Sequence, residues 1–144
     1  GNYIQYLSQK RFLPWKLTLK TIFNLYNSDF EEFAEYFPNF EKLYHSKVCE
    51  LSGGEIRIVE VWLVLNSDAP FAILDEPFAE LSPIAIEQVE KIILLKKRGK
   101  GIIISDHNYE TILRLSDKVL LLWEGYVTRV KEREDLIRCG YIRF

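Results

Sequence analysis

The sequence contains no methionine among its 144 residues. Because translation starts with methionine, we expect it to be an excised piece of a longer chain. Cysteine is almost as scarce, with Cys49 and Cys139 far apart and in no Cys-x-x-Cys or His-spaced pattern. Neither a zinc site nor a disulfide framework is therefore predicted, and a reduced cytoplasmic setting is the default expectation.

Two further absences limit the partners of the chain. No apolar run approaches the roughly 18–20 residues that a membrane-spanning helix needs, so any membrane role is expected to be peripheral. The N-terminus also lacks the basic-then-apolar pattern of a signal peptide. The formal net charge is −2, with Lys and Arg scattered among Asp and Glu, which gives no electrostatic case for a nucleic-acid partner.

The residues that are present suit a folded domain. Hydrophobic residues make up 48% of the chain and aromatic residues 14%, which is ample material for a core. Apolar strand patterns alternate with helical patterns, and this alternation predicts an α/β fold with a largely parallel sheet and crossover helices. Strands are expected at 2–7, 71–74, 102–105, 119–123 and 126–130, and helices from Thr18, from Ser28 or Asp29, at 40–45, from Ser82 to about 98, at 109–115 and at 133–139.

The segment Leu51–Glu55 (LSGGE) has the composition of a phosphate-binding helix start. Gly53 and Gly54 leave backbone N–H groups unobstructed, and Ser52 adds a hydroxyl donor. The following residues up to Leu65 are mostly β-branched and alternate like a strand at first. Periodicity alone therefore does not predict a helix after Ser52.

Three acidic or titratable residues follow two apolar strand patterns. Asp75 and Glu76 come directly after Phe71–Leu74, and His107 follows shortly after Ile102–Ser105. Strand ends of a parallel sheet are the usual place for ligands in open α/β folds. Taken singly, each pattern is often a plain surface turn, so the specificity lies in their combination and order.

Together, the LSGGE segment, the Asp75–Glu76 pair and His107 resemble the C-terminal half of an ABC-type ATPase, the nucleotide-binding subunit of ABC transporters. The resemblance implies a partial P-loop NTPase-like (RecA-like) core with a small helical subdomain. It places the helical subdomain with the signature motif at about residues 10–66 and the C-terminal part of the catalytic core at about 67–144. It also favours a helix from Ser52, with Arg57 and Glu60 on its wet side.

The resemblance implies a role for each of these residues. Asp75 would hold Mg²⁺, Glu76 would act as the base that polarises the attacking water, and His107 would donate to the γ-phosphate of ATP. Gln9 would touch the Mg²⁺ and the water. Across a head-to-tail dimer, ATP would also be contacted by Ser52, Gly53, Gly54, Glu55 and Ser82.

Partners and location follow from the same resemblance. A second ABC ATPase subunit would complete the ATP sites, and a membrane permease subunit would bind the helical subdomain. Phe12 and Trp15 are candidate contacts for this permease, although they could equally pack under their own loop. The protein would then be cytoplasmic and peripheral at the inner face of the membrane.

The sequence departs from the family pattern at several places. It lacks the P-loop, Gly-x-x-x-x-Gly-Lys-Ser/Thr, so we expect the chain to be inactive alone. Ser82 stands where most relatives carry Asp, and Ile58 and Leu63 replace helix-supporting arginines. Missing strands beside 71–75 would leave a partly open sheet edge that favours association with another copy.

Two alternative functions remain open from the sequence. The chain could belong to a soluble ABC protein that serves translation or cofactor assembly without a permease. It could also be a non-catalytic ABC-like interaction module that never carried a P-loop.

Overall fold

The computed structural model describes residues 2–143. The chain divides into two compact units, a first that ends at Ser105 and a second that begins at Asp106. In the described range, no helix has both the length and the apolar character needed to cross a bilayer.

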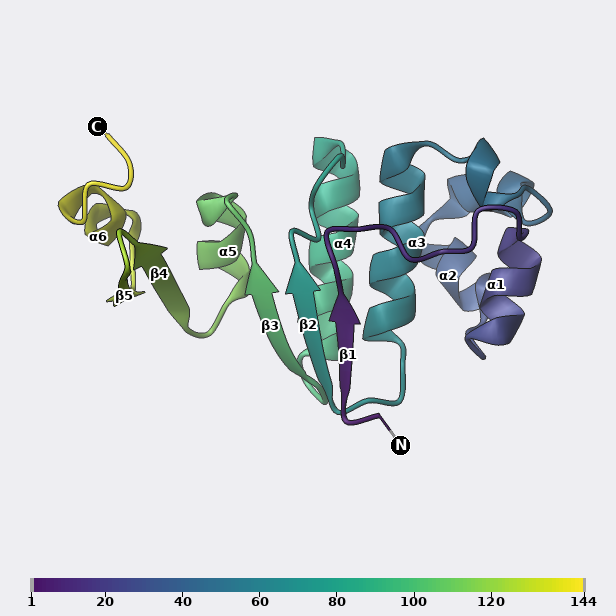
Figure 1. Cartoon of the computed structure of the whole chain (residues 1–144), viewed down its shortest axis with the longest axis horizontal. Coiled ribbons are helices and arrows are strands. Elements are labelled where there is room, and N and C mark those ends of the chain that lie inside the picture. Colours follow the sequence, from purple (N-terminus) through teal and green to yellow (C-terminus); the bar gives the residue numbers. More distant parts are fainter. Residues whose placement is uncertain (1, 144) are drawn as a thin grey trace. The chain divides into compact units, whose positions relative to one another are not determined.

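The first unit is built on a sheet of three parallel strands in the order β1-β2-β3 (Figure 1). β1 covers Ile4–Leu7, β2 covers Phe71–Asp75 and β3 covers Gly101–Ser105. β2 is thus paired on both sides, so the expectation that strands beside it are missing was wrong. The edges of this sheet are β1 and β3.

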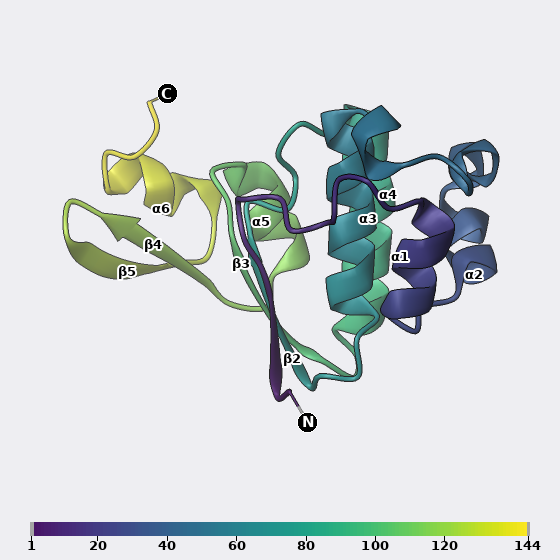
Figure 2. The ribbon, with the colours of Figure 1, turned by 45° about the vertical axis from the view of Figure 1, so that its right-hand side comes forward.

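The two faces of this sheet differ in their cover. Helices α3 (Gly53–Leu65) and α4 (Pro83–Lys96) lie over one face, where Leu7, Ala72 and Leu74 are buried (Figure 2). Because side chains alternate along a strand, the neighbouring residues point to the opposite face. That face carries large exposed apolar side chains: Ile4, Tyr6, Phe71 and Ile103.

Short helices fill the segment between β1 and α3. α1 (Leu19–Leu25) is capped by Thr18 and α2 (Phe30–Tyr36) by Asp29, whose side chains accept backbone N–H bonds of the first turn. Two 3₁₀ helices follow, η1 (Pro38–Leu43) and η2 (Val48–Glu50). The helix expected at 40–45 therefore begins earlier and is 3₁₀, because Pro38 ends α2 and starts a tighter turn.

An aromatic cluster holds these helices against α3. The ring of Phe33 lies 5.1 Å from Phe23, 4.9 Å from Phe40 and 5.3 Å from Trp62 of α3, measured between centroids. Trp62 also donates its indole N–H to Ser28 Oγ at 3.1 Å. Figure 2 shows α3 between the sheet and the α1–α2 pair.

This position explains the unusual sequence of α3. All ten residues from Ile56 to Leu65 are buried, so the helix needs no polar stripe. The helix predicted from Ser52 is confirmed, and its apolar character comes from burial on all sides. The placement of Arg57 and Glu60 on a wet side was wrong, since Arg57 is 6% and Glu60 0% exposed.

The second unit contains a helix, a hairpin and a last helix. α5 spans Tyr109–Leu115, β4 (Val119–Trp123) pairs antiparallel with β5 (Tyr126–Val130), and α6 spans Arg133–Arg138. Glu124 and Gly125 both have positive φ, as a two-residue type I′ hairpin turn requires. These elements match the expected ranges closely.

Candidate functional site

Asp75 lies at the carboxyl end of β2, among donors from both neighbouring strands. Ser105 Oγ donates to Asp75 Oδ1 at 2.7 Å, and Gln9 Nε2 donates to the same oxygen at 3.3 Å. Tyr6 O–H donates to Asp75 Oδ2 at 3.3 Å. Because parallel strands end at one edge of a sheet, three segments distant in sequence meet at one carboxylate.

These donors favour the charged form of the carboxylate. The hydrogen bond from Ser105 is the largest cause that lowers the pKa of Asp75, and the hydrogen bonds from Gln9 and Tyr6 lower it further. Partial burial of Asp75 has the opposite effect and raises its pKa. Asp75 is therefore an ionised, oriented and partly exposed group. This is the state that a ligand for a hard cation requires.

Tyr6 and Ser105 also belong to this site, although no sequence motif assigned them to it. The signal was available in the register, because Ser105 pairs with Asp75 across β2 and β3. Tyr6 pairs with Ile73, on the same face as Asp75. Finding them required knowledge of which strands are neighbours.

Glu76 has a different backbone conformation from Asp75. Its φ is 49°, in the left-handed region that non-glycine residues seldom adopt. Its N–H donates to the carbonyl oxygen of Ser105 at 2.7 Å. This bond holds the turn that follows β2 against the last residue of β3. Strained backbone of this kind clusters at functional sites.

Ser52 and Glu55 close the N-terminus of α3 with a reciprocal pair of hydrogen bonds. Ser52 Oγ accepts the N–H of Glu55 at 3.2 Å, and Glu55 Oε2 accepts the N–H of Ser52 at 2.7 Å. This is a capping box, which stabilises the first turn of a helix. Both side chains thus have a structural role in this chain, in addition to the expected contact with ATP.

The segment after β2 packs tightly on the glycines of α3. A Cβ on Gly54 would come within 2.8 Å of the backbone oxygen of Glu80. A Cβ on Gly53 would collide with the side chains of Glu80 and Arg11, which form an ion pair. Glu80 itself has a φ of 64°, so a non-glycine residue is held in the left-handed region here.

Ser82 and His107 complete the set of expected residues. Ser82 is the N-cap of α4, where its Oγ accepts the N–H of Ala85 at 3.2 Å. His107 lies in the second unit, exposed, with Nδ1 3.8 Å from Asp106 Oδ1. Of the predicted residues, the structure joins Gln9 to Asp75 and Ser52 to Glu55 by hydrogen bonds.

Asp75 and the Gln9 amide beside it are candidate ligands for Mg²⁺. Among the described residues, no group of three or more His, Cys, Asp or Glu side chains could hold a metal ion. Mg²⁺ in phosphoryl-transfer sites is typically bound by one or two carboxylates together with substrate phosphates and waters. A single ionised Asp75 beside an amide side chain fits that requirement.

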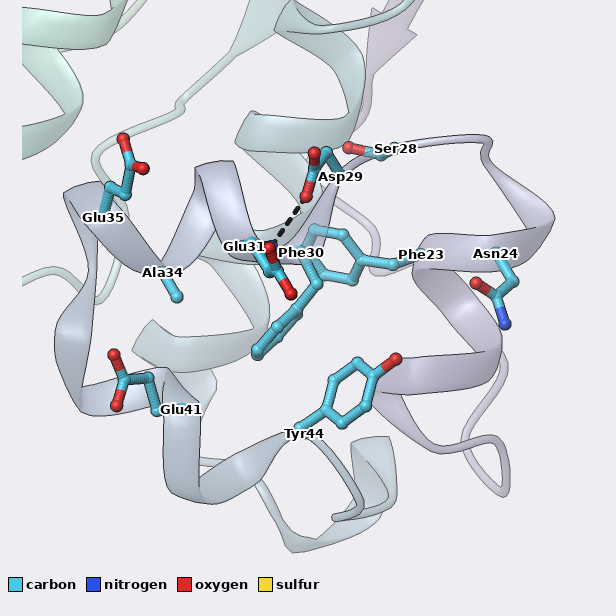
Figure 3. A pocket seen from close by; sticks show the side chains of 10 residues that line it. All are labelled: Phe23, Asn24, Ser28, Asp29, Phe30, Glu31, Ala34, Glu35, Glu41 and Tyr44. Atoms are coloured by element: carbon cyan, nitrogen blue, oxygen red, sulfur yellow. Dashed lines mark hydrogen bonds between the residues drawn. The ribbon is translucent and has the colours of Figure 1, made fainter.

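A separate hollow of about 740 Å³ lies in the helical region. Figure 3 shows the rings of Phe23, Phe30 and Tyr44 in it, with carboxylates around them. The hollow shares no residue with the set predicted to bind ATP. Its lining residues are Phe23, Asn24, Ser28, Asp29, Phe30, Glu31, Ala34, Glu35, Glu41 and Tyr44.

Sequence comparison identifies relatives over much of the chain. The lipopolysaccharide export system ATP-binding protein LptB of Acidithiobacillus ferridurans is 34% identical over 102 residues, which are 70% of this chain and 42% of LptB. LptB of Haemophilus influenzae is 40% identical over 88 residues, 60% of this chain and 36% of that protein. The chain thus spans less than half of these relatives. No protein-family model matches it.

Solved structures agree with the sequence relatives. The ATP-binding subunit of an ABC transporter matches with a TM-score of 0.74 and 25% identity, over 96% of this chain and 62% of that one. A chain in the complex of the archaeal ribosomal stalk protein aP1 and the archaeal ribosome recycling factor aABCE1 matches with a TM-score of 0.75 and 25% identity, over 96% of this chain and 30% of that one.

The fold class is therefore that of an ABC ATPase, a P-loop NTPase-like domain, as the motifs predicted. More particularly, the chain is homologous to ABC transporter ATP-binding proteins and corresponds to part of their length.

Proposed function

We propose that this chain is part of an ATP-binding and ATP-hydrolysing subunit of an ABC transporter. The observation that carries the proposal is the Asp75 carboxylate, held ionised by Ser105 and Gln9 at the carboxyl edge of a parallel sheet. The homology to ABC transporter ATP-binding proteins supports the same reading.

In this proposal, Asp75 and Gln9 would hold Mg²⁺, which when bound neutralises charge on the phosphates of ATP. Glu76 would take the proton of the attacking water. It directly follows Asp75, and its positive φ gives its side chain a different direction from that of Asp75. His107 would donate to the γ-phosphate. Phosphates of an ATP held by a second copy would be contacted by Ser52, Gly53, Gly54, Glu55 and Ser82.

The partners and the location belong to the same proposal. A head-to-tail dimer would bring the N-terminus of α3 to the second subunit's ATP, where free N–H groups and the helix dipole favour a phosphate. A permease would bind the helical subdomain, on which Trp15 is 56% exposed. Such a subunit would be cytoplasmic and peripheral at the inner face of the membrane.

The proposal is tested by Glu76→Gln in the longer protein that contains this chain. The variant should bind ATP like the wild type, because the phosphate contacts remain. It should lose turnover by about 10²–10⁴-fold, the usual contribution of a general base. ATP affinity and steady-state phosphate release measure the two effects, and normal hydrolysis would remove Glu76 from the mechanism.

A second function is favoured by the likeness to the ribosome recycling factor aABCE1. An ABC protein of that kind would serve translation without a permease. The two proposals are distinguished by the chains that co-purify with the full protein from its source cells. A membrane-spanning subunit supports the transporter, and ribosomal proteins support the alternative.

A further inference from the structure

Among the described residues of the first unit, Glu60 on α3 is the most deeply buried charged side chain. Its side chain is fully buried and lies 3.3 Å from the guanidinium of Arg57, measured from Nη1 to Oε2. Burial is the largest cause that raises the pKa of Glu60, against the lowering effect of Phe12 and Arg57. A buried ion pair contributes little net stability compared with apolar residues of the same size. Its role is therefore sought in the groups that the two side chains contact.

Both members of the pair hold the backbone of the segment that follows β1. Glu60 Oε1 accepts the N–H of Phe12 at 2.8 Å. Arg57 donates from Nη1 to the carbonyl oxygen of Ser8 at 2.9 Å and from Nη2 to that of Gln9 at 3.5 Å. Two side chains one turn apart on α3 thus fix both ends of a five-residue stretch.

That stretch carries the amide that reaches the catalytic edge of the sheet. Arg57 holds the backbone of Gln9, while the side chain of Gln9 donates to Asp75 Oδ1 at 3.3 Å. A continuous set of contacts therefore runs from α3, through the Gln9 backbone, to the Asp75 carboxylate at the end of β2. Outer groups that orient a ligating side chain commonly tune metal affinity.

We propose that Arg57 and Glu60 are positioning residues that set Gln9 against Asp75 and thereby tune the Mg²⁺ affinity of the ATP site. The proposal rests on the proposed function, because it assigns Gln9 and Asp75 to the metal. It makes the body of α3 part of the ATP site formed by its own subunit, whereas the proposed function uses only the N-terminus of α3, toward the second copy's ATP.

The test uses the full-length protein and three variants. The double variant Arg57→Met with Glu60→Leu removes both tethers and leaves no unpaired buried charge, a change that buried ion pairs often tolerate. Glu60→Gln keeps an oxygen that can accept the N–H of Phe12. Ile58→Val is the matched control, a mild core change on the same helix at a buried position.

Each variant is tested at the segment and at the ATP site. Amide hydrogen exchange of residues 8–13 reports whether the segment is released, with or without nucleotide. The Mg²⁺ concentration for half-maximal ATP hydrolysis reports the Mg²⁺ affinity of the ATP site. The ATP affinity measured without Mg²⁺ shows whether nucleotide binding itself has changed.

The double variant should exchange faster at Phe12 and need about 10–100-fold more Mg²⁺, with metal-free ATP affinity unchanged. Glu60→Gln should lie between it and the wild type, and Ile58→Val should match the wild type in both readouts.

Unchanged exchange in the double variant would overturn the tether. Faster exchange with unchanged Mg²⁺ dependence would make the pair a structural anchor and overturn the positioning role. A wild type that does not hydrolyse ATP would instead overturn the proposed function, so the two failures can be told apart.

Discussion

Gly53 and Gly54 are adjacent at the start of one helix, yet their surroundings differ in kind. The space beside Gly53 is limited by the ends of two flexible side chains, Glu80 and Arg11. The space beside Gly54 is limited by the backbone oxygen of Glu80. A side chain can rotate away from a new methyl group, whereas a backbone fixed between β2 and α4 cannot do so without distorting the turn.

We therefore predict different results for the same substitution at these positions. Gly53→Ala should change the free energy of unfolding by no more than about 1 kcal/mol, because the higher helix propensity of Ala offsets the side-chain shift. Gly54→Ala should destabilise by about 1–3 kcal/mol, the usual range for overpacking. Urea unfolding of this chain measures both, and equal losses would show that the Glu80 backbone is not the obstacle.

At the scale of the element, α3 is stabilised at its start by the Ser52–Glu55 capping box and along its length by burial. The hydroxyl group of Ser52 has two roles, as the helix cap and in the proposed contact with ATP. Substitutions can separate these uses, since asparagine caps helices as well as serine does but lacks the hydroxyl.

We predict that Ser52→Ala lowers the free energy of unfolding by about 1 kcal/mol, while Ser52→Asn leaves it nearly unchanged. Chemical denaturation of this chain compares the two. In the full-length protein, Ser52→Asn should then report the ATP contact without a stability effect. Equal destabilisation by both variants would contradict the capping role.

At the scale of the whole molecule, one face of the three-stranded sheet is rich in exposed apolar side chains. Ile4, Tyr6 and Phe71 are each 54% exposed, and Ile103 is 64% exposed. Contiguous apolar patches on soluble domains commonly mark contact surfaces. We expect this face to bind a second copy of the chain at high concentration.

Ile103→Lys should weaken that self-association at least about tenfold, because burying an isoleucine contributes about 1.5–3 kcal/mol and each 1.4 kcal/mol is a factor of ten. Ile84→Lys is the control, with the same residue and charge change at a 71% exposed position on α4. Sedimentation equilibrium measures both. Equal weakening by the two variants would attribute the effect to charge, and a monomeric wild type would contradict the contact.

Local sequence signals were sufficient for most elements. Ser82 was predicted to begin a helix, and either Ser28 or Asp29 was predicted to cap α2, where the structure shows Asp29 as the cap. Cap signals of this kind can be read from the sequence because they act within one turn. The parallel α/β architecture followed from the alternation of strand and helix patterns. For α3, local pattern indicated a strand, and only the family resemblance gave the helix, since burial on all sides removes the helical period.

What the sequence by itself determined was therefore the order of elements and the residues at strand ends, which depend on local propensity and on motifs. Only the tertiary structure decided that Ser105 and Tyr6 share the Asp75 carboxylate and that β2 is flanked on both sides. It also decided that Arg57 and Glu60 are buried against the Gln9 segment. These contacts join residues about 30 to 70 positions apart, and strand order and packing, which no local pattern encodes, bring them together.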